Sequence, residues 1–366
     1  MPGLPRPGDA VAAAVNAFDA TIRGGIADTR RMPSELIDDG PQRRVHRFLA
    51  GDRRPRRRAL PVLLVPPLAA PATCFDLRRG CSVVEHLVRQ GRPTYLVHYG
   101  PVRFGDRSLG LEHWIEDVVP RAVRAVAHDA GERPVQLVGW CLGGILALLA
   151  HAADAGLPVA SVALVASPFD VARVPLVAPL RPVAALTQGR VVTELYRLLG
   201  GAPAPLVKRG YQVLAIDKYL MKPWTVLRNL HDRELLAQIE AVDAFMDGMH
   251  AYPGRTFGQL YHRFLRANDL AGGRLVLSDR TLELDAVRVP LLAFAGTGDG
   301  IAPVAACHRL GALVPNAPSV QLETAPGGHL GVLTGRAARG TTWVLLDRFL
   351  ADHDVQRRRQ RRRTAV

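Results

Sequence analysis

The stretch that decides the fold is Val138-Gly139-Trp140-Cys141-Leu142-Gly143-Gly144. An apolar run leads into Gly-x-Cys-x-Gly, and an apolar pattern with helical spacing follows. This order is typical of a nucleophile elbow, a sharp turn between a buried strand and a helix. We expect Gly139 and Gly143 to be required because a side chain at either position would meet neighbouring backbone. The turn would lift the Cys141 sulfur above a sheet, at a helix N-terminus whose partial positive charge favours a thiolate.

Short apolar runs bounded by glycine and proline surround this stretch and alternate with amphipathic segments. The alternation predicts an α/β protein with a mostly parallel central sheet, and the elbow specifies the α/β-hydrolase fold. Because the runs are apolar throughout, we expect their strands to be buried on both faces. The expected strands are Ala59–Val65, Thr94–Tyr99, Val135–Gly139, Val159–Ala166, Val289–Ala295 and Ser319–Thr324. The expected core helices are Ser82–Gln90, Leu111–Ala130, Ile145–Ala155, Ala302–Leu313 and a last one near Thr341–Leu350.

The rhythm of strands and helices stops between Ser167 and about Asp285. This insertion separates two strands of one sheet, so it predicts a helical cap over the carboxyl edge, where open α/β folds bind ligands. Its expected helices are Val191–Leu199, Arg233–Met249 and Phe257–Asn268. The expected organisation is an N-terminal helical and Arg-rich extension (1–59) with one helix at Asp9–Arg23, a first core part (60–166), the cap (167–285), a second core part (286–350) and a disordered basic tail (351–366).

A nucleophile elbow requires an acid and then a histidine later in the chain. Asp299 follows the expected strand Val289–Ala295, and His329 lies in a glycine-rich loop after Ser319–Thr324. We therefore take Cys141, Asp299 and His329 as the candidate catalytic residues, with His329 accepting the thiol proton and Asp299 orienting the imidazole. The competing interpretations are structural: a small buried cysteine, a turn aspartate and a structural histidine.

Two backbone N–H groups are the candidate oxyanion hole. Leu142, directly after the nucleophile, would supply one donor. The second should come from the loop after the first core strand, Val65-Pro66-Pro67-Leu68-Ala69. Prolines have no N–H, so Leu68 is the first available donor in that loop. A cysteine nucleophile suits thioester exchange, because a thiolate both attacks and leaves an acyl thioester readily.

Most of the net charge of +14 over 366 residues resides in two arginine clusters. Hydrophobic residues make up 48% of the chain, which rules out wholesale disorder. Arginine runs can bind RNA, anionic membranes or polyphosphates, but no RNA-binding motif accompanies them, so we expect solvated segments and no nucleic-acid partner. The clusters are Arg53, Arg54, Arg56, Arg57 and Arg58, and Arg357, Arg358, Arg359, Arg361, Arg362 and Arg363.

The four cysteines show no CxxC pair and no zinc-like spacing with histidine. We therefore expect neither a metal site nor a disulfide framework, and a reducing compartment. The N-terminal apolar run Ala10–Val15 is too short for a signal peptide, and no stretch approaches the length of a membrane span. The expected location is the cytoplasm.

An ordered set of motifs over roughly residues 60–350 resembles the polyhydroxyalkanoate (poly-3-hydroxybutyrate) synthase family, of the short-subunit type. The matching motifs are Leu64-Val65-Pro66-Pro67-Leu68 with Asp76-Leu77, Gly139-Trp140-Cys141-Leu142-Gly143-Gly144, Ser167-Pro168-Phe169-Asp170, Pro223-Trp224, Asn268-Asp269-Leu270 with Gly272-Gly273, Asp299-Gly300-Ile301-Ala302-Pro303 and Gly327-Gly328-His329-Leu330-Gly331.

The resemblance implies an acyltransferase that polymerises 3-hydroxyacyl-CoA and releases CoA. In that family Cys141 would carry the growing chain as a thioester and His329 would activate the thiol, while Asp299 would orient His329 or serve as base toward the substrate hydroxyl. The resemblance implies no cofactor beyond the acyl-CoA substrate. It also implies association with a polyester granule surface, and either a smaller partner subunit or a homodimer.

Two features depart from the family. The cap (167–285) matches it only at scattered points, and neither arginine cluster is typical of it. Two other functions therefore stay open. One is an α/β-hydrolase-fold thioesterase or other acyl hydrolase with the same Cys-His-Asp triad. The other is a non-catalytic granule or RNA-binding protein that has kept the fold.

Overall fold

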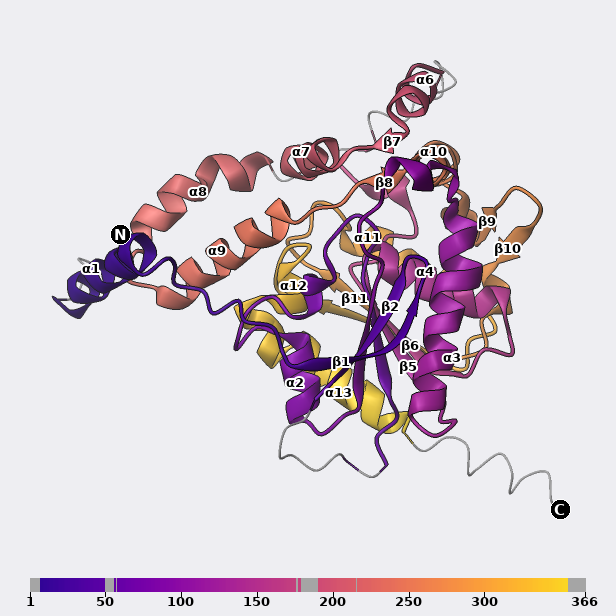
Figure 1. The fold of residues 1–366 in the computed structure, drawn as a ribbon, viewed down its shortest axis with the longest axis horizontal. Coiled ribbons are helices and arrows are strands. Elements are labelled where there is room, and N and C mark those ends of the chain that lie inside the picture. The colour runs from indigo at the N-terminus through magenta and orange to yellow at the C-terminus, as the bar shows by residue number, and fades with distance from the viewer. Residues whose placement is uncertain are drawn as a thin grey trace.

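The computed structural model describes residues 7–49, 56, 58–175, 177–178, 190–214 and 216–354. Its centre is an eight-stranded sheet in the order β1-β2-β4-β3-β5-β6-β11-β12 (Figure 1). The six strands from β4 to β12 run parallel, and β1 and β2 join them as an antiparallel hairpin. The strands are β1 (Ser34–Gly40), β2 (Arg43–Phe48), β3 (Val62–Val65), β4 (Thr94–His98), β5 (Val135–Trp140), β6 (Val159–Val165), β11 (Leu291–Gly296) and β12 (Val320–Ala325). The α/β class and the mostly parallel sheet predicted from the apolar runs are confirmed.

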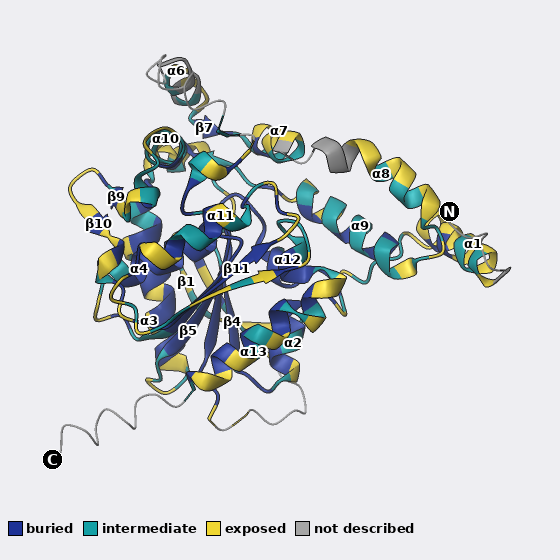
Figure 2. Cartoon of the chain, turned by 180° about the vertical axis from the view of Figure 1, so that it is seen from behind, coloured by how far each residue is buried: buried dark blue, intermediate teal, exposed yellow. Residues whose placement is uncertain are grey.

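The central strands are buried because helices cover both faces of the sheet. Every residue of β3, β5 and β11 is buried (Figure 2). The prediction was wrong for β12, where Gln321 and Leu322 are exposed. The reason is its place at the edge, where it pairs with β11 alone.

Helices α3 and α4 pack on one face of the sheet, and α2 and α13 on the other (Figure 1). The core helices are α2 (Val83–Arg89), α3 (Val119–Asp129), α4 (Leu142–Ala153), α11 (Val304–Cys307), α12 (Gly331–Thr334) and α13 (Thr342–Asp352). The expected helix Leu111–Ala130 is a π-helix at His113–Val118 that continues into α3, with Pro120 in the first turn of α3. Short 3-10 helices lie at Ala72–Phe75, Phe104–Ser108, Val171–Arg173, Asp269–Gly272, Leu284–Ala286, His308–Ala312 and Arg336–Gly340.

The insertion between β6 and β11 is largely helical, as its sequence predicted. It contains α6 (Arg190–Leu199), α7 (Ala204–Leu214), α8 (Ile216–Arg228), α9 (Arg233–Asp247), α10 (Gly254–Gln259) and a π-helix at Leu260–Ala267. Two small antiparallel pairs complete it: β7 (Gly201–Ala202) with β8 (Tyr252–Pro253), and β9 (Arg274–Val276) with β10 (Thr281–Glu283). Helices α8 and α9 extend beyond the body of the molecule, where the N-terminal helix α1 (Pro7–Ile22) meets them (Figure 1).

The N-terminal extension contributes to the central sheet, which its polar sequence did not predict. Val45 and Phe48 of β2 point into the core, while Arg43 is buried against Asp38 of β1. Because β1 lies at the outer edge, most of its residues stay exposed or half-buried, so its sequence lacks the apolar run of a central strand.

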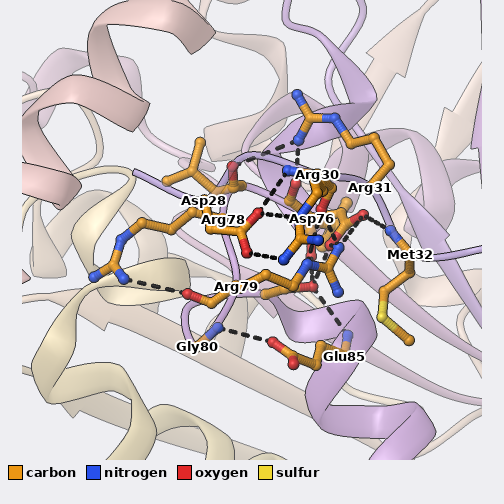
Figure 3. Close-up of polar contacts among 12 residues, drawn as sticks. Asp28, Arg30, Arg31, Met32, Asp76, Arg78, Arg79, Gly80 and Glu85 are labelled. Carbon is orange, nitrogen blue, oxygen red and sulfur yellow. Dashed lines mark hydrogen bonds and ion pairs between the residues drawn. The ribbon is translucent and has the colours of Figure 1, made fainter. Parts of the chain in front are cut away.

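The segment between α1 and β1 is held to the core by Asp76 (Figure 3). The carboxylate of Asp76, which is buried, accepts hydrogen bonds from Met32 N at 2.8 Å and Ser82 Oγ at 2.6 Å. Arg79 pairs with the same carboxylate and donates to the carbonyl of Arg30. These contacts place β1 beside β2 while α1 reaches the cap.

The disordered tail was expected from residue 351, but α13 extends to Asp352 and Asp354 pairs with Arg92. The rest of the tail, residues 355–366, lies outside the described residues, as do Arg53, Arg54 and Arg57. Of the first arginine cluster, Arg56 and Arg58 are described, and both are exposed. None of the helices in the described ranges is both long enough and apolar enough to cross a membrane.

Candidate active site

Cys141 occupies the turn between β5 and α4. Its backbone has φ 54° and ψ −125°, a conformation that residues other than glycine rarely adopt. Gly139 and Gly143 permit the turn: an added Cβ would lie 2.4 Å from the Gly144 Cα at the first position and 2.1 Å from the Val65 carbonyl oxygen at the second. The expected steric need for both glycines is confirmed. The elbow brings the Cys141 thiol to the carboxyl edge of the sheet.

Asp299 and His329 meet beside this turn. His329 Nδ1 lies 2.8 Å from Asp299 Oδ2; the Asp299 side chain is fully buried, and that of His329 is 10% exposed. The other carboxylate oxygen accepts hydrogen bonds from Ile301 N at 2.8 Å and Ala302 N at 2.9 Å. These three contacts fix the carboxylate, which in turn fixes the orientation of the imidazole.

Electrostatics link His329 to Cys141. Burial by itself lowers the pKa of His329, but the charges of Cys141 and Asp299 raise it to about 10. Burial raises the pKa of Asp299, but the charge and hydrogen bond of His329 bring it below its usual value. His329 Nε2 is buried and has no partner of standard hydrogen-bond geometry among the described residues. A protonated imidazole in this place is the counter-charge that a thiolate needs.

Trp140 fixes the histidine loop from the nucleophile side. Its indole Nε1–H donates to the carbonyl of His329 at 3.0 Å, and its ring lies 5.1 Å from the imidazole ring. On its other side Phe245 of α9 makes an edge contact at 6.0 Å. Trp140 therefore joins β5, the histidine loop and the cap. Sequence reasoning missed this role, although Trp140 stands next to the nucleophile in the motif.

A cavity of about 830 Å³ opens above these residues. Its floor includes Cys141, Asp299 and His329, and its wall comes from α7, α8 and α9 of the cap. The wall is mainly apolar, with Tyr211, Lys222 and Asp243 among its polar members. Its apolar side chains include Met221, Leu235, Ile239, Val242, Phe245, Met246 and Met249. The cap thus covers the carboxyl edge and creates a site suited to an acyl chain.

The two candidate oxyanion donors lie at the same edge. Leu142 is the first residue of α4, where backbone N–H groups have no partner within the helix. Leu68 lies in the loop after β3, next to Pro67, which lines the cavity. Neither N–H has an acceptor among the described residues.

Burial makes two of the other cysteines unlike a reactive thiol. All four cysteines are free and buried, and burial raises the pKa of the Cys74 and Cys307 thiols. Within the described ranges no group of three or more His, Cys, Asp or Glu side chains is placed to hold a metal ion.

Several proteins with sequences similar to this chain are named as poly(3-hydroxyalkanoate) polymerases. The chain is 22% identical over 294 residues to the poly(3-hydroxyalkanoate) polymerase subunit PhaC of Haloferax mediterranei, covering 80% of this chain and 59% of that protein. Identity is also 22% with the PhaC subunit of Allochromatium vinosum, with 86% and 87% covered, and 27% with that of Cupriavidus necator, with 74% and 46% covered. The chain is related to the poly(3-hydroxyalkanoate) polymerases. The resemblance inferred from the ordered motifs is thus confirmed.

The chain spans about three fifths of the Haloferax protein and under half of the Cupriavidus protein, but most of the Allochromatium one. No protein-family model matches it. Among solved structures, mouse alpha/beta hydrolase domain-containing protein 10 is similar at a TM-score of 0.47 and 14% identity, covering 87% of this chain and 98% of that one. An esterase from Rhodococcus gives a TM-score of 0.45 at 16% identity, covering 88% and 99%.

Proposed function

We propose that the chain is an acyltransferase that polymerises 3-hydroxyacyl-CoA through a thioester on Cys141 and releases CoA. One arrangement carries the proposal: a cysteine on a strained elbow, beside a buried His329–Asp299 pair, at the floor of an apolar cavity. The kinship with poly(3-hydroxyalkanoate) polymerases supports this acyl group and acceptor over others.

In the first step the Cys141 thiolate attacks the thioester carbonyl of the substrate. The carbonyl oxygen becomes an oxyanion, which the N–H groups of Leu142 and Leu68 stabilise. The carbon–sulfur bond to CoA then breaks, and the His329 imidazolium donates its proton to the departing CoA thiolate. The product is an acyl thioester on Cys141, and His329 is left neutral, with Asp299 holding its orientation.

In the second step the 3-hydroxyl group of another 3-hydroxyacyl-CoA attacks this thioester. Neutral His329 accepts the hydroxyl proton, either directly or with Asp299 assisting as base, and an ester bond forms as the Cys141 thiolate leaves. The lengthened acyl-CoA returns to Cys141 by the first step. The chemistry uses protein side chains and acyl-CoA alone and needs no further cofactor.

The alternative is a thioesterase or other acyl hydrolase with the same three residues, in which water takes the place of the hydroxyl group. The described geometry supports both reactions, because attack on an acyl thioester is common to them. The mainly apolar wall of the cavity favours the transferase, since it disfavours water near the acyl-enzyme.

The test incubates the full chain with 3-hydroxybutyryl-CoA and follows free thiol and precipitable polyester together. We expect both to appear, neither to appear with Cys141→Ala, and both to persist with Cys81→Ala, which removes a buried thiol outside the cavity. Thiol release with only free 3-hydroxy acid would establish the thioesterase. Absence of both products from the wild-type chain would favour the non-catalytic granule or RNA-binding protein.

A protein partner belongs to the same proposal. Helix α1 turns its polar residues toward the cap: Asn16 donates to the Leu230 carbonyl, and Asp19 pairs with Arg233. Its apolar residues therefore face outward, as do those of α8 (Figure 2). On these two helices the apolar residues that are more than half exposed and do not line the cavity are Val11, Val15, Phe18, Ile22, Leu220, Trp224 and Leu227. We propose that a smaller partner subunit or a second copy of the chain covers these faces, as contiguous apolar surface of this kind marks an interaction site.

Light scattering on the purified chain tests this surface. A second copy predicts a mass above the 39.7 kDa of the chain, reduced to the monomer by Phe18→Glu with Leu227→Glu. Leu198→Glu on α6 is the control, since Leu198 is even more exposed, at 80%, but lies outside the two faces. If the wild-type chain is a monomer, the smaller partner subunit is the remaining candidate to cover the apolar faces of α1 and α8. Association with polyester granules is proposed on separate grounds, because the growing chain would return to Cys141 after each addition.

A further inference from the structure

We infer that Ser167 is a positioning residue that aims the Leu142 N–H at the substrate oxyanion. The inference rests on the proposed acyl-transfer chemistry at Cys141 and assigns it a residue outside the triad. Ser167 follows β6, the neighbour of the nucleophile strand in the sheet, and its side chain is buried.

The Cys141 carbonyl is held by three donors. Ser167 Oγ donates to it at 2.7 Å, while Gly144 N and Ile145 N donate at 3.1 and 3.4 Å. The serine bond is the shortest of the three, and it is the one that does not come from α4 itself. It therefore ties the elbow to the next strand, rather than to the helix that the elbow begins.

The orientation of this carbonyl determines where the next N–H points. The peptide bond between Cys141 and Leu142 is trans, because the described chain has no cis peptide bonds. In a planar trans peptide the C=O and N–H point in opposite directions. With the carbonyl directed to Ser167, the Leu142 N–H points away from it, out of the N-terminus of α4, where the acyl carbonyl of a substrate on Cys141 would lie.

The serine is itself rigidly placed. Ala166, just before it, has φ 50°, and its N–H donates to the Phe294 carbonyl at 2.8 Å, so the chain turns sharply at the end of β6. Such strain in a non-glycine residue persists only where the surroundings enforce it. On the other side, Gly144 leaves the room that the hydroxyl occupies: a Cβ there would lie 2.3 Å from Ser167 Oγ. The result is a fixed donor beneath the elbow.

This role differs from that of the triad because it acts on the oxyanion and not on the thiol. Acyl transfer creates a negative oxygen that needs the Leu142 N–H, whereas alkylation of Cys141 by iodoacetamide displaces iodide at a saturated carbon and creates no oxyanion. The two reactions share the thiolate and its access. Their ratio therefore reports the oxyanion hole alone.

The experiment measures Cys141 acylation by p-nitrophenyl acetate and by 3-hydroxybutyryl-CoA, and alkylation by iodoacetamide, in the same variants. Ser167→Ala should slow acylation by about 10-fold or more, a smaller effect than the loss of about 10²- to 10³-fold caused by removing an oxyanion donor itself. The rate of alkylation should stay within about 2-fold of the wild-type rate. Ser167→Cys keeps the volume but donates poorly, so it should behave like Ser167→Ala. Ser167→Thr keeps the hydroxyl and should restore acylation. Ser161→Ala is the control and should change neither rate. It removes a buried hydroxyl that has no partner among the described residues from β6, the strand that precedes Ser167.

Two results would overturn the inference: acylation at the wild-type rate in Ser167→Ala, or an equal loss of acylation and alkylation, which would show that Ser167 merely holds the elbow. A wild-type chain that is acylated by p-nitrophenyl acetate but makes no polyester would fail the proposed function and leave this comparison intact. Melting temperatures of all variants separate a folding defect from a loss of rate.

Discussion

Replacing Gly143 by alanine should damage both the fold and the chemistry, because this residue lies where α4 meets the end of β3. An alanine Cβ would lie 2.1 Å from the Val65 carbonyl oxygen and 2.6 Å from the Pro66 carbonyl carbon. Ordinary contacts begin near 3.4 Å, so the two backbones must separate by more than about 1 Å. Neither can yield as a flexible side chain would.

The separation would open the candidate oxyanion hole, since Leu142 lies on one side of the contact and the loop that carries Leu68 on the other. We expect a loss of about 1 to 3 kcal/mol of stability from overpacking. A misplacement of about 1 Å at a reacting centre costs about 10²-fold in rate. Gly143→Ala should therefore melt several degrees lower and release CoA about 10²-fold more slowly.

The assay pairs a melting curve with CoA release from 3-hydroxybutyryl-CoA. Gly340→Ala is the matched control, because a Cβ at Gly340 meets nothing within 4 Å and the backbone there needs no glycine. If the Gly143→Ala variant has the wild-type melting temperature and the wild-type rate of CoA release, the close approach of α4 to β3 is unimportant and the reasoning is refuted.

Four further predictions concern the groups at the floor of the cavity. His329→Gln should reduce CoA release on the order of 10³-fold if the histidine transfers the proton, and a loss under about 10-fold would contradict that role. Cys141→Ser should leave a folded protein with much reduced turnover, because a serine hydroxyl needs full assistance from the base; normal turnover would make the thiol incidental. Because the pKa of His329 rises to about 10 in the folded chain from about 6.5 unfolded, its stabilisation is complete below pH 6.5 and is lost as the pH rises toward 10. Urea unfolding at pH 6.5, 8 and 10 should show this decline in the wild-type chain and a smaller one in Asp299→Asn, and parallel curves would exclude it. Trp140→Phe should retain the ring contact and lose the bond to the His329 carbonyl, whereas Trp140→Leu should also lower the pKa of His329 in an NMR titration; an unchanged titration in Trp140→Leu would show that the indole ring does not support the imidazolium.

The parallel strands and the elbow were predictable because burial on both faces demands apolar runs, and the turn demands glycine at fixed positions. The same logic led to Asp299 and His329, since strand order places their loops at one edge. The β1–β2 hairpin was not predicted because β2 places Arg44, His46 and Arg47 between its buried residues, so no apolar run marks it.

Contacts that depend on tertiary structure were beyond the sequence. Trp140 and Ser167 stood in recognised motifs, but the bond from Trp140 to the His329 carbonyl spans 189 positions of the chain. The hydrogen bond from Ser167 to Cys141 likewise joins two strands that only the folded sheet brings together. Residue type and spacing indicate the reacting groups, whereas their supports appear only in three dimensions.

The cap interrupts the chain between Cys141 and the Asp299–His329 pair. Cys141 precedes the insertion, and Asp299 and His329 follow it. Strands β6 and β11, which flank the insertion in the sequence, are direct neighbours in the sheet. A chain cut after Gly200 would therefore leave Cys141 on one polypeptide and Asp299 and His329 on the other. Each polypeptide would carry only some of the strands of the central sheet. Neither piece alone would hold all three candidate catalytic residues. Turnover on mixing would therefore report that the two pieces had associated, and fusing each piece to another protein would make turnover a sensor for the association of those two proteins.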